Sequence, residues 1–216
     1  MSTRGNQKIA GAVLAFGFDF RGKTVLDIGS STGGFTEFAL DAGADLVVAV
    51  EKGARQMKAP LRFSPKVRLL EKTDIFEVTS EAHSPAGGFE GGKAIASEEM
   101  KKVVIPTPDV ILADVSFVSL RPILEHAKKW LAGPETEFLV MLKPQFEASD
   151  SQLNRGVVKN EKMRREIIAK FEDWLKHNGF FIKHKKDNDL AGKKGNVERF
   201  YWLTIVGRNE RKSRHN

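Results

Sequence analysis

The stretch VLDIGSSTGGF, residues 25–35, decides the fold class of this chain. An apolar run typical of a strand passes directly into a glycine-rich loop, and the pattern FTEFALDAG that follows is typical of a helix. A strand, a glycine loop and a helix in this order indicate an open α/β sheet, in which ligands bind beyond the carboxyl ends of the strands. Gly29, Gly33 and Gly34 would let the backbone approach such a ligand closely.

The same alternation of apolar runs and helical patterns continues along the chain, which predicts an α/β fold with a mostly parallel sheet and helices on both faces. The last two apolar segments, GFFIKHKK and ERFYWLTIV, are predicted to pair as a hairpin. The predicted strands cover residues 24–29, 45–51, 66–70, 109–115 and 137–143, and the predicted helices cover 5–16, 35–43, a short segment near 56–62, 119–132 and 160–177.

Residues 80–108 interrupt this alternation, because they contain four glycines, three prolines and no clear period. A segment of this length without secondary structure is either a functional loop or a tolerated insertion, and we favour the insertion. We interpret residues 1–206 as one domain that contains the insertion, and residues 207–216 as a basic C-terminal tail.

The composition excludes several classes of site. The chain has 216 residues and no cysteine, which excludes disulfides, thiolate zinc sites and cysteine nucleophiles and favours a cytoplasmic location. No apolar stretch reaches the ~20 residues of a membrane span, so we expect no membrane partner, and the N-terminus lacks the pattern of a signal peptide. The net charge of +7 favours a polyanionic partner such as nucleic acid. The five histidines lack metal-ligand spacing, so we predict no metal site.

Three acidic residues stand at the ends of successive predicted strands. Asp27 lies beneath the glycine loop, where a carboxylate would repel a phosphate but suit a cationic ligand. Glu51 is placed to bind ribose hydroxyls, and Asp74 to accept from an adenine amino group. Each acid alone is more often a turn residue or a helix cap, but the ordered set indicates S-adenosylmethionine (AdoMet). The predicted cofactor-binding residues are Asp27, Gly29, Ser31, Gly33, Gly34, Phe35, Glu51, Asp74 and Asp114.

A lysine ends the apolar run of EFLVMLKPQFE, residues 137–147. Burying Lys143 without a partner would be costly, and Asp114, at the end of the run in DVILADVSF, can supply the carboxylate. Both strand ends lie on the rim that holds the glycine loop, so we expect the two residues to meet in the active site. On spacing alone, a plain salt bridge at the rim is an equally good interpretation.

Together with Lys8 and Glu198, these two residues resemble the Lys-Asp-Lys-Glu tetrad of ribose 2′-O-methyltransferases. The segments TRGNQK, LDIGSSTGGFT, ADVSFVSL, LKPQFEA and GNVERF are similar to signature segments of the TlyA (hemolysin A-type) RNA methyltransferases, relatives of the FtsJ-like heat-shock methyltransferase. The resemblance extends from Ser2 to Val206. It implies a class I (Rossmann-like) AdoMet-dependent methyltransferase that modifies ribose 2′-hydroxyls of ribosomal RNA.

The resemblance also implies a role for each member of the tetrad. Lys143 would act as the base or would orient the hydroxyl, and Asp114 would hold Lys143 in position. Lys8 and Glu198 would complete the charge balance and contact the ribose. Nearby, Phe117 and Phe146 would either stack a base of the RNA or pack in the core. The candidates for phosphate contact are Arg4, Lys193 and Lys194.

The chain departs from the family at several places. The family usually has SRGGLK where this chain has TRGNQK, and a KGG-VV-D run where it has NRGVVKN. A stretch that contains SP is replaced by DNDLAGKKGN, and the acid that ends the second strand is Glu51 instead of the commoner aspartate. Family members usually begin with a small RNA-binding domain, which would lie before Thr3. The resemblance is therefore to the methyltransferase domain without this module. The chain is either a catalytic fragment or reaches RNA by another route, and both alternatives stay open.

Two alternative functions stay open. The first is a class I methyltransferase that acts on a base, a protein or a small molecule, which is disfavoured because DVSF lacks the N/D-P-P-Y-like motif of base-amino enzymes. The second is a non-enzymatic AdoMet-fold protein, either haemolysin-like or RNA-binding. It is disfavoured because no amphipathic or membrane-spanning segment supports lysis, and because the chain keeps all four tetrad residues.

Overall fold

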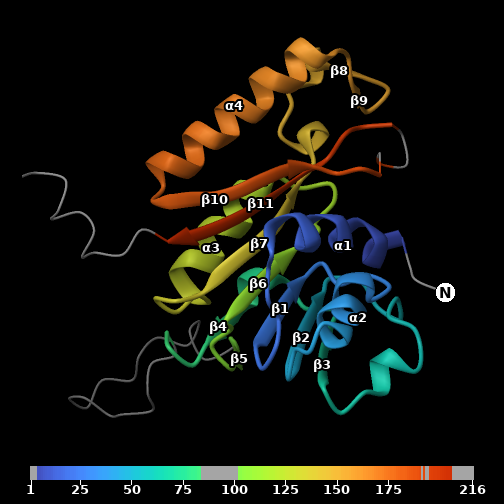
Figure 1. Ribbon diagram of the computed structural model, residues 1–216, viewed down its shortest axis with the longest axis vertical. Coiled ribbons are helices and arrows are strands. Elements are labelled where there is room, and N and C mark those ends of the chain that lie inside the picture. Colours follow the sequence, from blue (N-terminus) through green and yellow to red (C-terminus); the bar gives the residue numbers. More distant parts are fainter. Residues whose placement is uncertain (1–3, 84–101, 191, 193–194, 206–216) are drawn as a thin grey trace, which may run out of the picture.

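A central sheet of seven strands organises the molecule (Figure 1). The computed structural model describes residues 4–83, 102–190, 192 and 195–205. The strands of the sheet are β1 Thr24–Ile28, β2 Leu46–Glu51, β3 Val67–Glu71, β6 Val110–Ala113, β7 Glu137–Leu142, β10 Phe180–Asp187 and β11 Arg199–Ile205. Their spatial order is β10-β11-β7-β6-β1-β2-β3. β11 runs antiparallel to both of its neighbours, and all other pairs are parallel, so the predicted α/β class and the closing hairpin are confirmed.

Helices cover both faces of this sheet, as predicted (Figure 1). The α-helices are α1 Arg4–Phe16, α2 Gly34–Asp41, α3 Leu120–Trp130 and α4 Glu161–His177. Successive strand side chains point to opposite faces: Val25 packs with α1 and α2, whereas Leu26 belongs to the cluster that includes α3 and α4. Each face of the sheet therefore has its own apolar core.

The connection between β2 and β3 differs from the prediction. The helix expected near residues 56–62 is wrong, because the segment forms only a short 3-10 turn, η1 Leu61–Phe63. Pro60 immediately precedes this turn. A proline lacks the backbone N–H donor, and its ring clashes with the preceding helical turn, so an α-helix that started near residue 56 could not continue through it.

The predicted boundaries of the irregular segment 80–108 are wrong at both ends. Its two ends contribute to a small parallel pair of strands, β4 Val78–Ser80 and β5 Val103–Ile105. Both strands bury apolar side chains in the core beside α3, and this burial stabilises strands that are too short to be recognised by period. Residues 84–101, the middle of the predicted insertion, lie outside the described residues.

Several short elements were not predicted. Two of them follow β7 as 3-10 turns, and a hairpin of two very short strands then leads into α4. These elements are η2 Ile75–Glu77, η4 Pro144–Phe146, η5 Asp150–Gln152, β8 Leu153–Asn154 and β9 Val157–Val158.

The order of the strands reverses between β1 and β6. From β1 the chain continues to β2 and β3 on one side, and it then returns to β6 and β7 on the other side. The loops after β1 and β6 therefore diverge at the carboxyl edge of the sheet, which is where ligands bind in folds of this class.

Candidate active site

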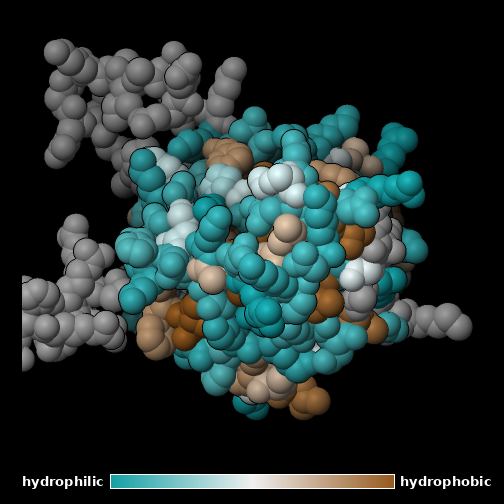
Figure 2. All heavy atoms as spheres, turned by 90° about the horizontal axis from the view of Figure 1, so that it is seen from above, coloured by the Kyte–Doolittle hydropathy of each residue, from teal (hydrophilic) through white to brown (hydrophobic). Residues whose placement is uncertain are grey.

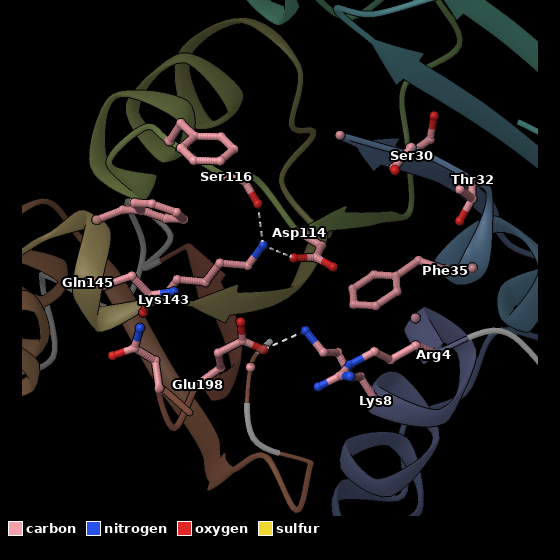
Figure 3. A pocket seen from close by; sticks show the side chains of 18 of the residues that line it. Arg4, Lys8, Ser30, Thr32, Phe35, Asp114, Ser116, Lys143, Gln145 and Glu198 are labelled. Atoms are coloured by element: carbon pink, nitrogen blue, oxygen red, sulfur yellow. Dashed lines mark hydrogen bonds and ion pairs between the residues drawn. The ribbon is translucent and has the colours of Figure 1, made fainter. Parts of the chain in front are cut away.

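A pocket of about 700 Å³ opens at this carboxyl edge. Its walls come from α1, the glycine loop, the segments after β6 and β7, the β8–β9 hairpin and the segment before β11. Figure 3 shows charged side chains of several of these elements converging on one space. The predicted site residues in the wall are Lys8, Asp27, Gly29, Ser31, Gly34, Phe35, Asp114, Lys143 and Glu198.

The glycine loop between β1 and α2 brings backbone close to the pocket. Gly29 has a φ of +79°, and a Cβ atom there would lie 3.3 Å from the backbone oxygen of Asp114. Gly33 has a φ of +91°, and a Cβ atom there would collide with the side chain of Leu61. A side chain at either position would therefore be both conformationally strained and obstructed.

Asp27 is fully buried beneath this loop. Its Oδ2 accepts a hydrogen bond from Thr36 Oγ1 at 2.6 Å, whereas its Oδ1 has no hydrogen-bond partner among the described residues. Burial raises the pKa of Asp27 to about 7; the hydrogen bond from Thr36 opposes this rise, and the negative charges of Asp114 and Glu51 add to it. A buried acid with an unpartnered oxygen suits a cationic group in the pocket.

Lys143 and Asp114 directly follow the neighbouring parallel strands β7 and β6. Lys143 Nζ lies 2.6 Å from Asp114 Oδ1, and it donates a hydrogen bond to Ser116 Oγ at 2.7 Å (Figure 3). The side chains of Lys143 and Asp114 are 9% and 22% exposed. The ammonium group is therefore fixed at the pocket wall, and the predicted meeting of the two strand ends is observed.

A second ion pair lies in the same pocket. Lys8, on α1, lies 2.6 Å from the Oε2 atom of Glu198, and the two side chains are 11% and 4% exposed. Glu198 reaches this edge because it precedes β11, whose antiparallel direction places its amino end beside the carboxyl end of β7. Two cations and two carboxylates are thus assembled without a net charge, which makes their burial tolerable.

An exposed aromatic side chain stands at the pocket wall. Phe117 is 91% exposed and has a φ of +63°, an uncommon conformation for a bulky residue. Its ring centroid lies 5.3 Å from that of Phe146, which is partly buried. The alternative that Phe117 packs in the core is therefore wrong. Arg4 also lines the pocket, whereas Lys193 and Lys194 lie outside the described residues.

The family model of the FtsJ-like methyltransferases matches residues 1–204. The chain belongs to the FtsJ-like methyltransferase family. It is therefore a methyltransferase, and the pocket at the carboxyl edge is the candidate active site of an FtsJ-like enzyme.

Curated relatives of this FtsJ-like chain are similar over most of its length. The 16S/23S rRNA (cytidine-2'-O)-methyltransferase TlyA of Mycobacterium tuberculosis is 35% identical over 202 residues, which cover 93% of this chain and 67% of that protein. The 23S rRNA (cytidine-2'-O)-methyltransferase TlyA of Campylobacter jejuni is 30% identical over 188 residues, 86% of this chain and 64% of that protein. The chain thus spans about two thirds of the length of these relatives.

A further relative is named as a hemolysin and not as a methyltransferase. Hemolysin A of Brachyspira hyodysenteriae is 29% identical over 197 residues, which cover 91% of this chain and 73% of that protein. Within the part of the chain that the structure describes, no helix combines the length and the apolar character that crossing a membrane would require.

Solved structures agree with the FtsJ-like assignment. A hemolysin-type protein from Lactococcus lactis is 32% identical and superimposes with a TM-score of 0.77, covering 93% of this chain and 86% of that one. A protein from Listeria monocytogenes, described as an S-adenosylmethionine-dependent methyltransferase, is only 16% identical, with a TM-score of 0.60 over 94% of this chain and 99% of that one. The second likeness shows the fold alone, and it confirms the predicted class I architecture.

Three of the predicted cofactor-binding residues do not line the FtsJ-like pocket. Glu51 accepts hydrogen bonds from the backbone N–H groups of Ser31 and Gly53, at 2.9 and 2.7 Å, and thereby holds the glycine loop. Asp74 caps η2 and pairs with Lys52 at 3.0 Å. Gly33 makes the left-handed turn before α2 without reaching the wall.

Several groups in the pocket were not predicted from the sequence. Ser116 holds Lys143, and its place two residues after Asp114 in ADVSFVSL was the only signal for it. The β8–β9 hairpin and Asn196 also contribute to the wall. The hairpin was not predicted, because strands of two residues each are too short to show an alternation of apolar and polar side chains.

Proposed function

We propose that this FtsJ-like chain is an AdoMet-dependent ribose 2′-O-methyltransferase that acts on ribosomal RNA in the cytoplasm. The observation that carries the proposal is the presence of two lysine–carboxylate pairs, Lys143–Asp114 and Lys8–Glu198, in one pocket beside a glycine loop. Two relatives are named as rRNA (cytidine-2'-O)-methyltransferases, which supports the same substrate class.

The residues of the glycine loop fit AdoMet. Asp27 Oδ1 and Ser30 Oγ are buried polar atoms that lack hydrogen-bond partners among the described residues, and both residues line the pocket. The charged substituent of AdoMet carries an ammonium group and a sulfonium, which such a carboxylate would attract. AdoMet, when bound, supplies an electrophilic methyl group. Asp27, Ser30, Ser31 and the backbone of Gly29 would hold it, while Glu51 shapes the loop through Ser31.

Lys143 is the group that we assign to the ribose hydroxyl. Asp114 and Ser116 together fix its Nζ atom, so the nitrogen has a defined position from which to orient the 2′-oxygen. During transfer this oxygen would gain the methyl group that AdoMet supplies and lose its proton. Lys143 would first release one ammonium proton to solvent, and its amine would then accept the hydroxyl proton. Lys8 and Glu198 keep the charge of the cluster balanced and offer a donor and an acceptor to the ribose.

The substrate side of the pocket suits a base that has left its stack. Phe117 presents an almost fully exposed ring, supported by Phe146 at a centroid distance of 5.3 Å. Proteins that recognise unpaired RNA commonly stack bases on such aromatic rings. We assign Phe117 to the base of the nucleotide whose ribose faces Lys143.

The test uses methyl-labelled AdoMet with ribosomal subunits that lack the modification, followed by digestion of the RNA to nucleosides. The wild-type protein is expected to place label in a 2′-O-methyl nucleoside, and Lys143→Ala is expected to lose it while it still binds AdoMet. Lys66→Ala, at an exposed position before β3, is the matched control and should retain activity. Label in a base or in protein would overturn the proposal and support the other class I reaction.

A further inference from the structure

The β8–β9 hairpin is an unassigned part of the pocket wall. Leu153 pairs with Val158 and Asn154 pairs with Val157, so Arg155 and Gly156 form a two-residue turn. Their φ angles are +48° and +81°, and two positive φ angles at the central positions characterise a type I′ turn.

The hairpin is fixed to the segment that carries Glu198. Asn196 is buried, its Oδ1 accepts from Val158 N at 3.0 Å, and its Nδ2 donates to Gly156 O at 3.0 Å. Leu153, Gly156 and Asn196 all line the pocket. The tip of the hairpin therefore has a defined position relative to the tetrad.

Arg155 occupies a position in this turn that favours other residues. The first central position of a type I′ turn favours asparagine, aspartate or glycine, because bulkier residues are strained at positive φ. The Arg155 side chain is exposed, and its guanidinium has no hydrogen bond or ion pair with any residue that the structure describes. Among the described residues, no contact of the Arg155 side chain itself offsets this strain, which favours a role for the side chain toward a ligand.

The charge of Arg155 is available to a polyanion. In the tetrad, Lys143 and Lys8 are each matched by a carboxylate, so the four groups contribute no net charge. Arg155 adds a positive charge at the rim that no carboxylate in the described residues neutralises. The side of the molecule above α4 and the hairpin is mostly hydrophilic, with only scattered apolar residues (Figure 2). Such a surface suits a phosphate chain better than an apolar partner.

We infer that Arg155 binds a backbone phosphate of the RNA, adjacent to the nucleotide whose ribose enters the pocket. A guanidinium can form two parallel hydrogen bonds to phosphate oxygens, and contacts of this kind fix the register of a nucleic acid on a protein. The inference rests on the proposed RNA methyltransferase function. It assigns Arg155 to positioning of the substrate and not to the chemistry of methyl transfer.

The test compares Arg155→Asn with the wild-type protein in steady-state methylation of ribosomal RNA at several salt concentrations. Asparagine suits the turn, so the hairpin should stay folded and the melting temperature should not fall. The KM for RNA should rise roughly tenfold, while kcat and the KM for AdoMet stay unchanged. The slope of log KM against log salt concentration should become shallower by about 1. Arg155→Lys should recover part of the affinity.

Arg55→Asn is the matched control, because Arg55 is also exposed and has a φ of +57°. It lies between β2 and β3, whereas Arg155 lies in the hairpin whose Leu153 and Gly156 line the pocket. If Arg155→Asn leaves KM and the salt slope unchanged, or if the control changes them equally, the inference is overturned and the proposed function stands. If the wild-type protein methylates no RNA, RNA binding is measured directly at the same salt concentrations. A shallower slope for Arg155→Asn then supports the phosphate contact alone, and absence of RNA binding overturns both proposals.

Discussion

Arg199 is paired with Leu142 across the antiparallel ladder of β11 and β7. The residues that adjoin this pair at the edge, Glu198 and Lys143, both line the pocket, although one precedes its strand and the other follows its strand. The antiparallel direction of a single strand thus adds a carboxylate to an edge where the parallel strands already place Asp114 and Lys143.

The pair of Lys8 and Glu198 should behave as a coupled unit. Lys8→Met leaves Glu198 buried without its partner, and we expect it to lower the free energy of unfolding by about 3–5 kcal/mol. The double variant Lys8→Met/Glu198→Gln removes both charges and should regain most of that stability, without regaining methyl transfer. Denaturant unfolding measures the stabilities, and the labelling assay measures the transfer. Equal stabilities of the single and double variants would contradict the coupling.

Asp27→Asn should separate stability from cofactor binding. The folded pKa of Asp27, about 7, lies above its ordinary value of 3.8, so the folded state binds this proton more tightly than the unfolded state. The stability that protonation of Asp27 contributes is complete below pH 3.8 and is lost as the pH rises to 7. Asparagine stays neutral, so the AdoMet-free variant should be more stable than the wild type at pH 8 by an amount that shrinks toward pH 4.

The same variant should bind AdoMet more weakly, because the carboxylate that attracts the cation is gone. Thermal unfolding from pH 4 to 8 tests the expected stability of Asp27→Asn, and calorimetric titration with AdoMet tests its expected loss of affinity. Asp41→Asn, at an exposed position at the end of α2, should change neither. A loss of stability at pH 8 together with unchanged AdoMet affinity would contradict the assignment.

Glu147 should control the geometry of the two segments that follow β6 and β7, which carry Asp114 and Lys143. Its buried carboxylate accepts from Ser119 Oγ at 3.0 and 2.9 Å and from Leu120 N at 2.7 Å, and it pairs with Arg121. These contacts tie the segment after Lys143 to the start of α3. We expect Glu147→Gln to lower stability by about 1–3 kcal/mol and kcat roughly tenfold, with AdoMet affinity unchanged.

Ser119→Ala removes the helix cap and one contact of this carboxylate, and it should cost only about 1 kcal/mol. Unfolding curves and single-turnover rates give both quantities. If the two variants lost stability equally and Glu147→Gln kept its full rate, Glu147 would serve the helix cap alone.

Phe117→Ala should weaken RNA binding without affecting the fold. Its side chain is 91% exposed, so the stability should change by no more than about 0.5 kcal/mol. Loss of a stacking platform should raise the KM for RNA roughly tenfold. Phe63→Ala removes another exposed ring, 76% exposed and outside the pocket wall, and should leave that KM unchanged. An unchanged KM for Phe117→Ala would exclude the stacking role.

The sheet and the charged edge that forms the pocket were predictable, because long apolar runs identify buried strands and a charged residue at the end of such a run requires a partner. Lys143 and Asp114 were identified on this basis, and their contact follows from the adjacency of β7 and β6. The strands β4 and β5 were not predicted, because a strand of three residues is too short to show an alternation of apolar and polar side chains.

The sequence did not show which of the three acids at the strand ends would line the pocket. A carboxylate at a strand end can serve either a ligand or the neighbouring backbone, and sequence does not distinguish the two. Asp27 lies in the pocket wall, whereas Glu51 binds backbone N–H groups of its own loop and Asp74 caps a 3-10 turn. Phe117 posed a different ambiguity, because the sequence does not show whether an aromatic side chain packs in the core or lies at the surface. The structure shows that this side chain is exposed.

The late position of β11 in the chain has a consequence for biosynthesis. Lys8 is made near the beginning and its partner Glu198 is 190 residues later, so a nascent chain that stops before β11 has Asp114 and Lys143 but an incomplete pocket. Until β11 arrives, β7 is an open edge of the sheet, available to unwanted pairing. The strand that follows Glu198 also covers that edge, so the pocket is completed and the edge of β7 is paired by the same segment of the chain.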